Sequence, residues 1–258
     1  MSRSNPENEV RNPSRYFFEF DAINGGFRYW DKEAKKTVPV PYPFRFYVLD
    51  TLVTLKGYNE PEKKGYWSNE VKSKDLSKAK FVVKSKQGGV EMIGSYKECK
   101  EKMEPKGLGY VQSVYIMYKD KDGPCIANVQ IKGSAIKPWI EFTKKHNIYK
   151  VAVDVSSHTE EKKGAVKYLA PVFRPIEKVN EESTIKANEL DAELQEYLKV
   201  YFEIKDGSNE QTLEQTVEAA NKPVNDAASD AVKPKAAVTS EPPVVYNDVV
   251  EDDSDLPF

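Results

Sequence analysis

The amino-acid sequence predicts a mostly β body with short helices, followed by one C-terminal helix and a disordered acidic tail. Asn24-Gly25-Gly26 separates Tyr16–Phe20 from Phe27–Trp30, and this pattern predicts a tight hairpin because Asn and Gly tolerate positive φ. The longest candidate strand runs from Phe44 to Lys56 and is dense in β-branched and aromatic residues. Beyond Gly207 the chain is rich in Asn, Ala, Pro, Val and acids and has few aromatic residues, which is typical of a flexible linker.

Further turn signals predict more hairpins in the body. Gly-containing turns at Gln87-Gly88-Gly89 and at Asp122-Gly123 each lie between two apolar runs, as in antiparallel strand pairs. Two later runs, Tyr149–Val155 and Val166–Phe173, are interpreted as closing strands. The paired runs at the two turns are Lys80–Lys84 with Val90–Ile93, and Tyr110–Lys119 with Ile126–Ile131.

Three helices are expected. Ser95–Met103 is one, and a second begins near Ser134, which we interpret as a serine N-cap with Pro138 in or near the first turn. The third covers residues 187–205, where Leu190, Leu194, Leu198 and other apolar residues recur at three- and four-residue spacing. That helix has two open interpretations: it packs on the body, or it pairs with another copy of the chain.

Charge divides the chain into two parts. Residues 207–258 hold three lysines against eleven acidic residues, whereas the rest holds 36 lysines and arginines against 30 acidic residues. A basic body with an acidic tail indicates an anionic partner for the body and a different partner, or self-masking, for the tail. We divide the chain into a flexible arm (1–13), a body (14–180), a helix (181–206) and a partner-docking tail (207–258).

Composition argues against several classes of protein. Two cysteines build no disulfide framework and no signal peptide is recognisable, so a cytoplasmic location is expected. No run approaches the roughly 20 apolar residues of a membrane-spanning helix. His146 and His158 stand alone, and Cys99 and Cys125 lack metal-ligand spacing, so neither an enzyme active site nor a metal or other cofactor is expected.

The tip of the tail carries the most specific motif. After several acids the chain ends in Leu256, Pro257 and Phe258, where the terminal ring can enter an apolar pocket while its carboxylate and the preceding acids meet Lys or Arg. An acidic tail alone is equally well explained as an aid to solubility. An apolar tripeptide at the most exposed point of the chain favours binding. The expected partner-binding residues are Asp252, Asp253, Asp255, Leu256, Pro257 and Phe258.

This tip resembles that of bacterial and phage single-stranded-DNA-binding proteins, which end in acids, an apolar residue, Pro and Phe. Tyr66–Val71 and Lys132–Ala135 leading into Trp139–Phe142 are similar to phage-type members of that family. The body is not closely similar to the tetrameric bacterial core, and the oligomeric state stays open between monomer and homo-oligomer. The resemblance implies an OB-like barrel over residues 14–180, single-stranded DNA as ligand, and replication and repair proteins as partners of the tail.

Aromatic and basic residues alternate in two segments, 27–36 and 56–74. Binding of a single strand without sequence specificity requires both residue types, and OB-fold proteins of this kind are the standard example of such binding. The second segment is polar and flanked by glycine, so its aromatic side chains are expected to face the ligand. We expect Trp67 to contact DNA and Trp139 to lie in the core, and either role is open for Trp30. The expected DNA-binding residues are Arg28, Tyr29, Trp30, Lys56, Tyr58, Lys63, Lys64, Tyr66, Trp67 and Lys72.

The sequence thus predicts a protein that coats single-stranded DNA without sequence specificity in replication, recombination and repair, and recruits partners through its tip. Two alternative functions remain open. One is a protein-interaction module whose tail mimics that of a genuine single-strand binder, and the other is a strand-annealing recombination factor.

Overall fold

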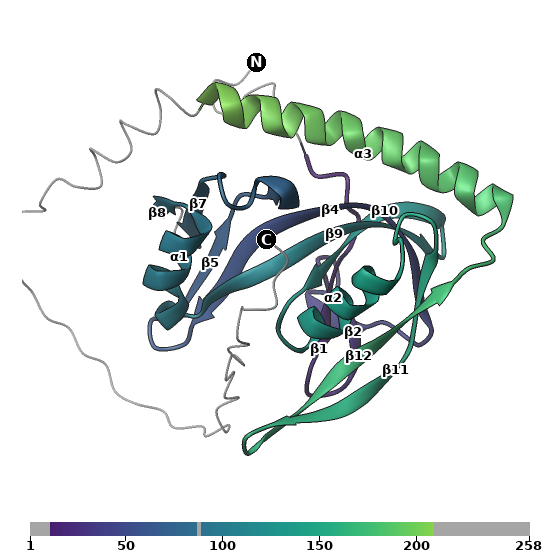
Figure 1. Ribbon diagram of the computed structural model, residues 1–258, viewed down its shortest axis with the longest axis horizontal. Coiled ribbons are helices and arrows are strands. Elements are labelled where there is room, and N and C mark those ends of the chain that lie inside the picture. The colour runs from purple at the N-terminus through teal and green to yellow at the C-terminus, as the bar shows by residue number, and fades with distance from the viewer. Residues whose placement is uncertain (1–10, 87–88, 209–258) are drawn as a thin grey trace, which may run out of the picture.

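The computed structural model describes residues 11–86 and 89–208, which form a mixed sheet with three α-helices and short 3-10 turns (Figure 1). The strands are β1 (Phe17–Asp21), β2 (Gly26–Asp31), β3 (Lys36–Pro39), β4 (Phe44–Asn59), β5 (Lys64–Ser68), β6 (Val71–Lys72), β7 (Phe81–Ser85), β8 (Val90–Gly94), β9 (Leu108–Asp120), β10 (Gly123–Ile131), β11 (Ala152–Lys163) and β12 (Val166–Ile176). The helices are α1 (Tyr96–Met103), α2 (Ile136–Lys145) and α3 (Glu181–Ser208). The short turns are η1 (Ser73–Asp75), η2 (Glu104–Lys106) and η3 (Gly133–Ala135).

The strands pair in the order β3-β2-β1-β10-β9-β4-β5-β7-β8, with β6 and the β11–β12 hairpin branching from β4. Only the contact between β1 and β10 is parallel among the described strand pairs; the other pairs are antiparallel. The prediction of a mostly β body is therefore confirmed. The pairing describes an open mixed sheet, and the OB-like barrel stays a prediction.

The expected hairpins are present. β1 pairs with β2 across the Asn24-Gly25-Gly26 turn, where Gly25 has a φ of +71°. β7 pairs with β8 and β9 with β10, as their turn signals predict, although residues 87–88 of the first turn lie outside the described residues. β4 is the longest strand described and β11–β12 forms the last hairpin. These local pairings follow from turn chemistry.

The N-termini of α1 and α2 are capped differently. α1 has the capping box of Ser95 and Glu98, in which each side chain bonds the other residue's backbone N–H. The expectation that Ser134 caps α2 is wrong, because η3 precedes the helix and Ser134 lies inside that turn. The N-cap is Ala135, which offers no side-chain hydrogen bond. Pro138 is the third residue of α2, where its missing N–H costs little.

α3 packs on the body of its own chain, which is one of its two predicted roles. Leu190, Leu194 and Leu198 are buried against Leu52 and Tyr115 of the sheet. Figure 1 shows the helix running along one side of the sheet, where it contacts β4 and β10. No helix within residues 11–86 and 89–208 is long and apolar enough to cross a membrane.

Long strands β4 and β9 connect two lobes (Figure 1). The α1 lobe consists of β5, β7, β8 and α1 around one apolar core, and the α2 lobe consists of β1, β2, β11, β12 and α2 around another. Gly57 of β4 meets Gly107 so closely that a Cβ on Gly57 would lie 1.8 Å from the Gly107 carbonyl oxygen. Gly107 itself has a φ of +80°. This close approach fixes the start of β9 against β4 at the edge of the α1 lobe.

Candidate nucleic-acid interface

A cleft of about 2040 Å³ lies between the two lobes, with β4 and β9 between its walls. Ten basic residues line it against six acidic ones, so the cleft has a net positive charge that favours an anionic ligand. The acidic residues are Glu19, Asp21, Glu60, Glu70, Glu104 and Glu141. The basic residues are Arg28, Lys56, Lys100, Lys106, Lys132, Lys137, Lys144, Lys162, Lys163 and Lys167.

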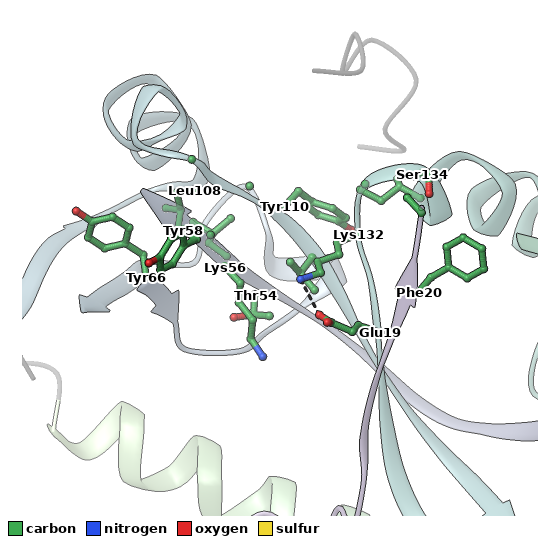
Figure 2. Close-up of a pocket in the computed structure, with 18 of the residues that line it drawn as sticks. Glu19, Phe20, Thr54, Lys56, Tyr58, Tyr66, Leu108, Tyr110, Lys132 and Ser134 are labelled. Atoms are coloured by element: carbon green, nitrogen blue, oxygen red, sulfur yellow. Dashed lines mark ion pairs between the residues drawn. The ribbon is translucent and has the colours of Figure 1, made fainter. Parts of the chain in front are cut away.

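Strand alternation places three of the predicted residues together on one face of the sheet. Lys56 and Tyr58 are two residues apart on β4, and Trp67 of β5 pairs directly with Lys56. Tyr58 pairs with Gly65, which has no side chain to cover the ring, and Tyr58 remains 49% exposed. Trp67 is 39% exposed. Figure 2 shows Lys56, Tyr58 and Thr54 projecting from β4 into the cleft.

Lys56 is the chemically unusual group of the cleft. Its side chain is half-buried, and within the described residues it has no ion-pair or hydrogen-bond partner. Burial lowers the pKa of its ammonium because the charged form loses hydration, and the charge of Glu70 offsets only part of this effect. An unpaired, partly dehydrated cation favours a ligand that brings a negative charge.

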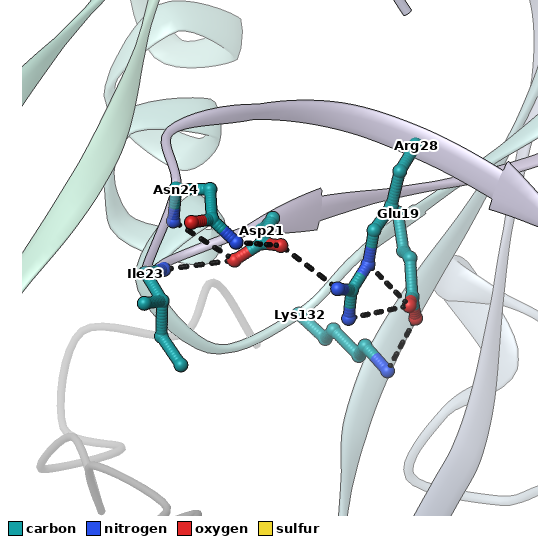
Figure 3. Close-up of polar contacts among 6 residues, drawn as sticks. All are labelled: Glu19, Asp21, Ile23, Asn24, Arg28 and Lys132. Carbon is teal, nitrogen blue, oxygen red and sulfur yellow. Dashed lines mark hydrogen bonds and ion pairs between the residues drawn. The ribbon is translucent and has the colours of Figure 1, made fainter. Parts of the chain in front are cut away.

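Acidic side chains neutralise other cations of the same cleft (Figure 3). Glu19 accepts from Arg28 on one oxygen and forms an ion pair of 3.0 Å with Lys132 through the other. Arg28 also bonds Asp21 at 2.8 Å. Burial raises the pKa of Glu19, but Lys132 and Arg28 together outweigh this and leave the pKa below its ordinary value. Arg28 is thus held by two carboxylates.

A partly buried polar cluster connects the cleft to α3. One oxygen of the Glu70 carboxylate accepts from the Ser113 hydroxyl and the other from the Tyr115 hydroxyl at 2.8 Å, while the Glu70 N–H donates to the Tyr201 hydroxyl at 3.0 Å. Asn128 in turn donates to Ser113. These bonds satisfy a half-buried carboxylate and hold α3 beside the cleft.

Tyr66 corrects the expectation that the aromatic residues of its segment are exposed. It is only 3% exposed and packs in the core of the α1 lobe. The reason is strand alternation: Tyr66 and Trp67 are consecutive on β5, so their side chains point to opposite faces. Trp139, assigned to the core, is fully buried as predicted.

Five other predicted residues lie outside the lining of the cleft. Tyr29 packs on the core of the α2 lobe, and Trp30 is 59% exposed on β2. Lys63 pairs with Glu60 and Lys64 with Glu91, each at 2.5 Å. Lys72 lies 5.0 Å from the centre of the Phe202 ring of α3. The predicted residues that do line the cleft are Arg28, Lys56, Tyr58, Tyr66 and Trp67. The predicted tail residues 252–258 lie outside the described residues.

Most of the cleft cations were not among the sequence predictions. Lys106, Lys137, Lys144 and Lys162 line the cleft and have no ion-pair partner in the described part of the chain. They come from segments far apart in sequence, each of which looks like an ordinary solvated lysine when read locally. Lys132 lies in Lys132–Ala135, one of the stretches that resemble the single-stranded-DNA-binding family, and this resemblance is the one local indication in the sequence that a cleft lysine binds DNA.

The expectation that the chain has no enzyme active site stays a prediction, and two features of the described side chains bear on it. No three His, Cys, Asp or Glu residues in that part of the chain gather at metal-binding distance. Burial raises the pKa of both Cys99 and Cys125 to about 11, so these thiols are protonated and weakly nucleophilic at neutral pH.

Comparisons of this chain with protein-family models, with curated proteins and with solved structures each find no match. The fold and the cleft therefore carry the functional argument.

Proposed function

We propose that this protein binds single-stranded DNA in the cleft between its lobes and coats it without sequence specificity. Bases stack on Tyr58 and Trp67, and phosphates meet Lys56 and the four wall lysines Lys106, Lys137, Lys144 and Lys162. Such stacking contributes about 1–3 kcal/mol per base and is tolerant of sequence because every base has an aromatic face.

The observation that carries the proposal is the position of Lys56. It is a partly dehydrated ammonium without an ion-pair partner in the described part of the chain, and its neighbours on the same face are two exposed aromatic rings. A solubilising surface lysine keeps its hydration, and an aromatic side chain packed for stability alone is buried. A ligand that combines negative charge with flat apolar rings satisfies all three groups together.

An OB-like barrel for the α2 lobe is part of the same proposal. Beyond the strand ladders, the backbone N–H of Leu169 on β12 donates to the carbonyl oxygen of Ala22 at 2.8 Å, and Tyr42 and His158 lie against the same β1–β2 turn. These contacts bring β12 to β1, as closure of a barrel requires.

The tail completes the proposed function. The tip of Asp252, Asp253, Asp255 and Leu256 to Phe258 recruits replication and repair proteins, and the acidic tail competes with DNA for the basic cleft. The cell compartment proposed for this activity is the cytoplasm.

The test is a titration with single- and double-stranded oligonucleotides of equal length at several salt concentrations, followed by fluorescence anisotropy. We expect preference for the single strand and a linear fall of log affinity with log salt, with a slope of about 0.7 for each phosphate neutralised on a single strand. Equal affinity for both forms, or no binding, would contradict the proposal and favour a protein-interaction module.

Lys56→Gln sharpens that test, with Lys121→Gln as its control. Lys121 is exposed in the β9–β10 turn and does not line the cleft. Lys56→Gln is expected to weaken binding and to lower the salt slope by about 0.7, the value for one phosphate. Removing a half-buried, unpaired charge should not destabilise the fold, so a lowered affinity reports binding. Equal effects of the two substitutions would rule out a role for the Lys56 charge.

A further inference from the structure

A second pair of exposed aromatic residues lies at the margin of the cleft, on β1 and β2. Phe17 is 39% exposed and Trp30 is 59% exposed. Phe18 pairs with Tyr29, so the next pair of this antiparallel register brings Phe17 opposite Trp30. Phe17 lies at the margin of the cleft lining, and Trp30 lies beyond it.

Both aromatic pairs lie on the same face of the sheet. Trp67 pairs with Lys56 and Lys56 with Gly109; Tyr115 is six residues further along β9, an even number, and so points to the same side. Tyr115 pairs with Asn128, and Asn128 with Phe17. The path from Trp67 to Phe17 crosses no register shift. Tyr115 and Asn128 themselves are buried, Tyr115 against α3, so a ligand passes from one pair to the other through the cleft, whose lining includes Tyr58, Trp67 and Phe17.

We propose that Phe17 and Trp30 form a second base-stacking station, which takes the continuation of the same DNA strand after it leaves the cleft. This inference rests on the proposed function. Of the five exposed aromatic side chains in the described residues, four are the two pairs on this face; the fifth is Tyr149. Such a concentration on one face is unexpected for aromatic rings that have no ligand.

Charge favours a nucleic acid over an apolar partner at this station. Exposed Lys32, Lys35 and Lys36 follow Trp30 on the β2–β3 hairpin, and none of them has an ion-pair partner within the described residues. Lys132 and Arg28 line the adjoining cleft, where Glu19 pairs with both. A strand that crosses this face therefore meets positive charge along its course.

The separation of the stations predicts dependence on strand length. Five inter-strand steps separate β5 from β2, which at about 4.8 Å each gives roughly 24 Å before any offset along the strands. A short oligonucleotide covers one station, whereas a strand near the upper end of the range of about 4–16 nucleotides per OB fold covers both.

Two reporter variants test this with the full-length protein. Trp30→Phe leaves Trp67 as the exposed fluorophore and Trp67→Phe leaves Trp30, while Trp139 stays buried in both. Phe keeps a stacking face in each case. We expect oligo-dT of about 4 nucleotides to quench Trp67, and oligo-dT of about 16 nucleotides to quench both reporters. If Trp30 fluorescence stays unchanged at DNA concentrations that saturate the quenching of Trp67, the second station is wrong and the proposed function stands. If neither tryptophan is quenched, both the second station and the proposed function are wrong.

Trp30→Ala and its control Tyr149→Ala complete the experiment. Both remove an exposed aromatic ring, but Tyr149 lies in the loop between α2 and β11 and does not line the cleft. Trp30→Ala is expected to lower affinity for the longer oligonucleotide about 5-fold or more, with a smaller loss for the shorter one, and Tyr149→Ala to change neither. A change of molecular mass in light scattering on Trp30→Ala without loss of DNA affinity would overturn the proposal and assign this surface to a second copy of the chain.

Discussion

Glu19 is the residue that most restrains the positive charge of the cleft. It holds Lys132 and Arg28, and it is itself partly exposed. Replacing its carboxylate by an amide of the same shape releases both cations for phosphates while leaving the packing unchanged. We expect Glu19→Gln to raise affinity for single-stranded DNA several-fold at low salt and to steepen the salt dependence, measured by anisotropy. Reduced affinity would contradict the view that Glu19 competes with the ligand.

The same substitution has a pH-dependent effect on stability. The pKa of folded Glu19 lies below its ordinary value of 4.5, so its ionised form stabilises the fold above that pH. This contribution, about 1 kcal/mol or less for a partly exposed group, is lost as pH falls through the folded-state pKa. Urea unfolding of the wild type and of Glu19→Gln should therefore differ near neutral pH and converge at acidic pH. A difference that grows on acidification would contradict this linkage.

Individual residues also show where prediction from sequence succeeds. Trp139 was assigned to the core because its helical neighbours are apolar, and it is buried. Tyr66 was expected to be exposed because its segment is polar, but composition averages over both faces of a strand. The alternation that separates Tyr66 from Trp67 was available in the sequence. The sequence does not show which of the two faces meets the core, because that depends on how β5 pairs with β4 and β7.

At the scale of elements, local signals predicted hairpins and helices well. Gly-containing turns fix their flanking strands because few residues adopt the required φ, and this information is local. The start of α2 was mispredicted because a preceding 3-10 turn moved the cap from Ser134 to Ala135. The lysines of the cleft walls were missed for a different reason: they approach one another only when β4, β9, α2 and β11–β12 are assembled. No local pattern encodes that proximity.

α3 supports an element-scale prediction, because its stability depends on packing. Leu194 is fully buried between the helix and the sheet, whereas Val200 on the same helix is exposed. Leu194→Ala is expected to lower the free energy of unfolding by about 2–5 kcal/mol, and Val200→Ala to leave it nearly unchanged because alanine is a good helix former. Urea denaturation followed by circular dichroism measures both. Equal effects would show that α3 does not depend on this contact.

At the scale of the whole molecule, the proposed function joins two parts of opposite charge. The body is net basic and contains the cleft, and residues 207–258 are strongly acidic. If the tail competes for the cleft, DNA and tail exclude each other there, and the tip becomes available to partners once DNA is bound. Binding of DNA and recruitment of partners are then linked without any change in the fold.

Truncation of residues 252–258 separates these roles. We expect the truncated protein to bind single-stranded DNA as well as the full chain or more tightly, because the tail loses part of the charge that competes for the cleft. The same protein should lose capture of replication and repair proteins in a pull-down. Phe258→Ala is the matched variant: it keeps every acidic side chain of the tip and removes the ring, so it should lose partners while leaving DNA affinity unchanged. Loss of DNA binding on truncation would contradict competition, and retained capture by Phe258→Ala would assign recruitment to acidity alone.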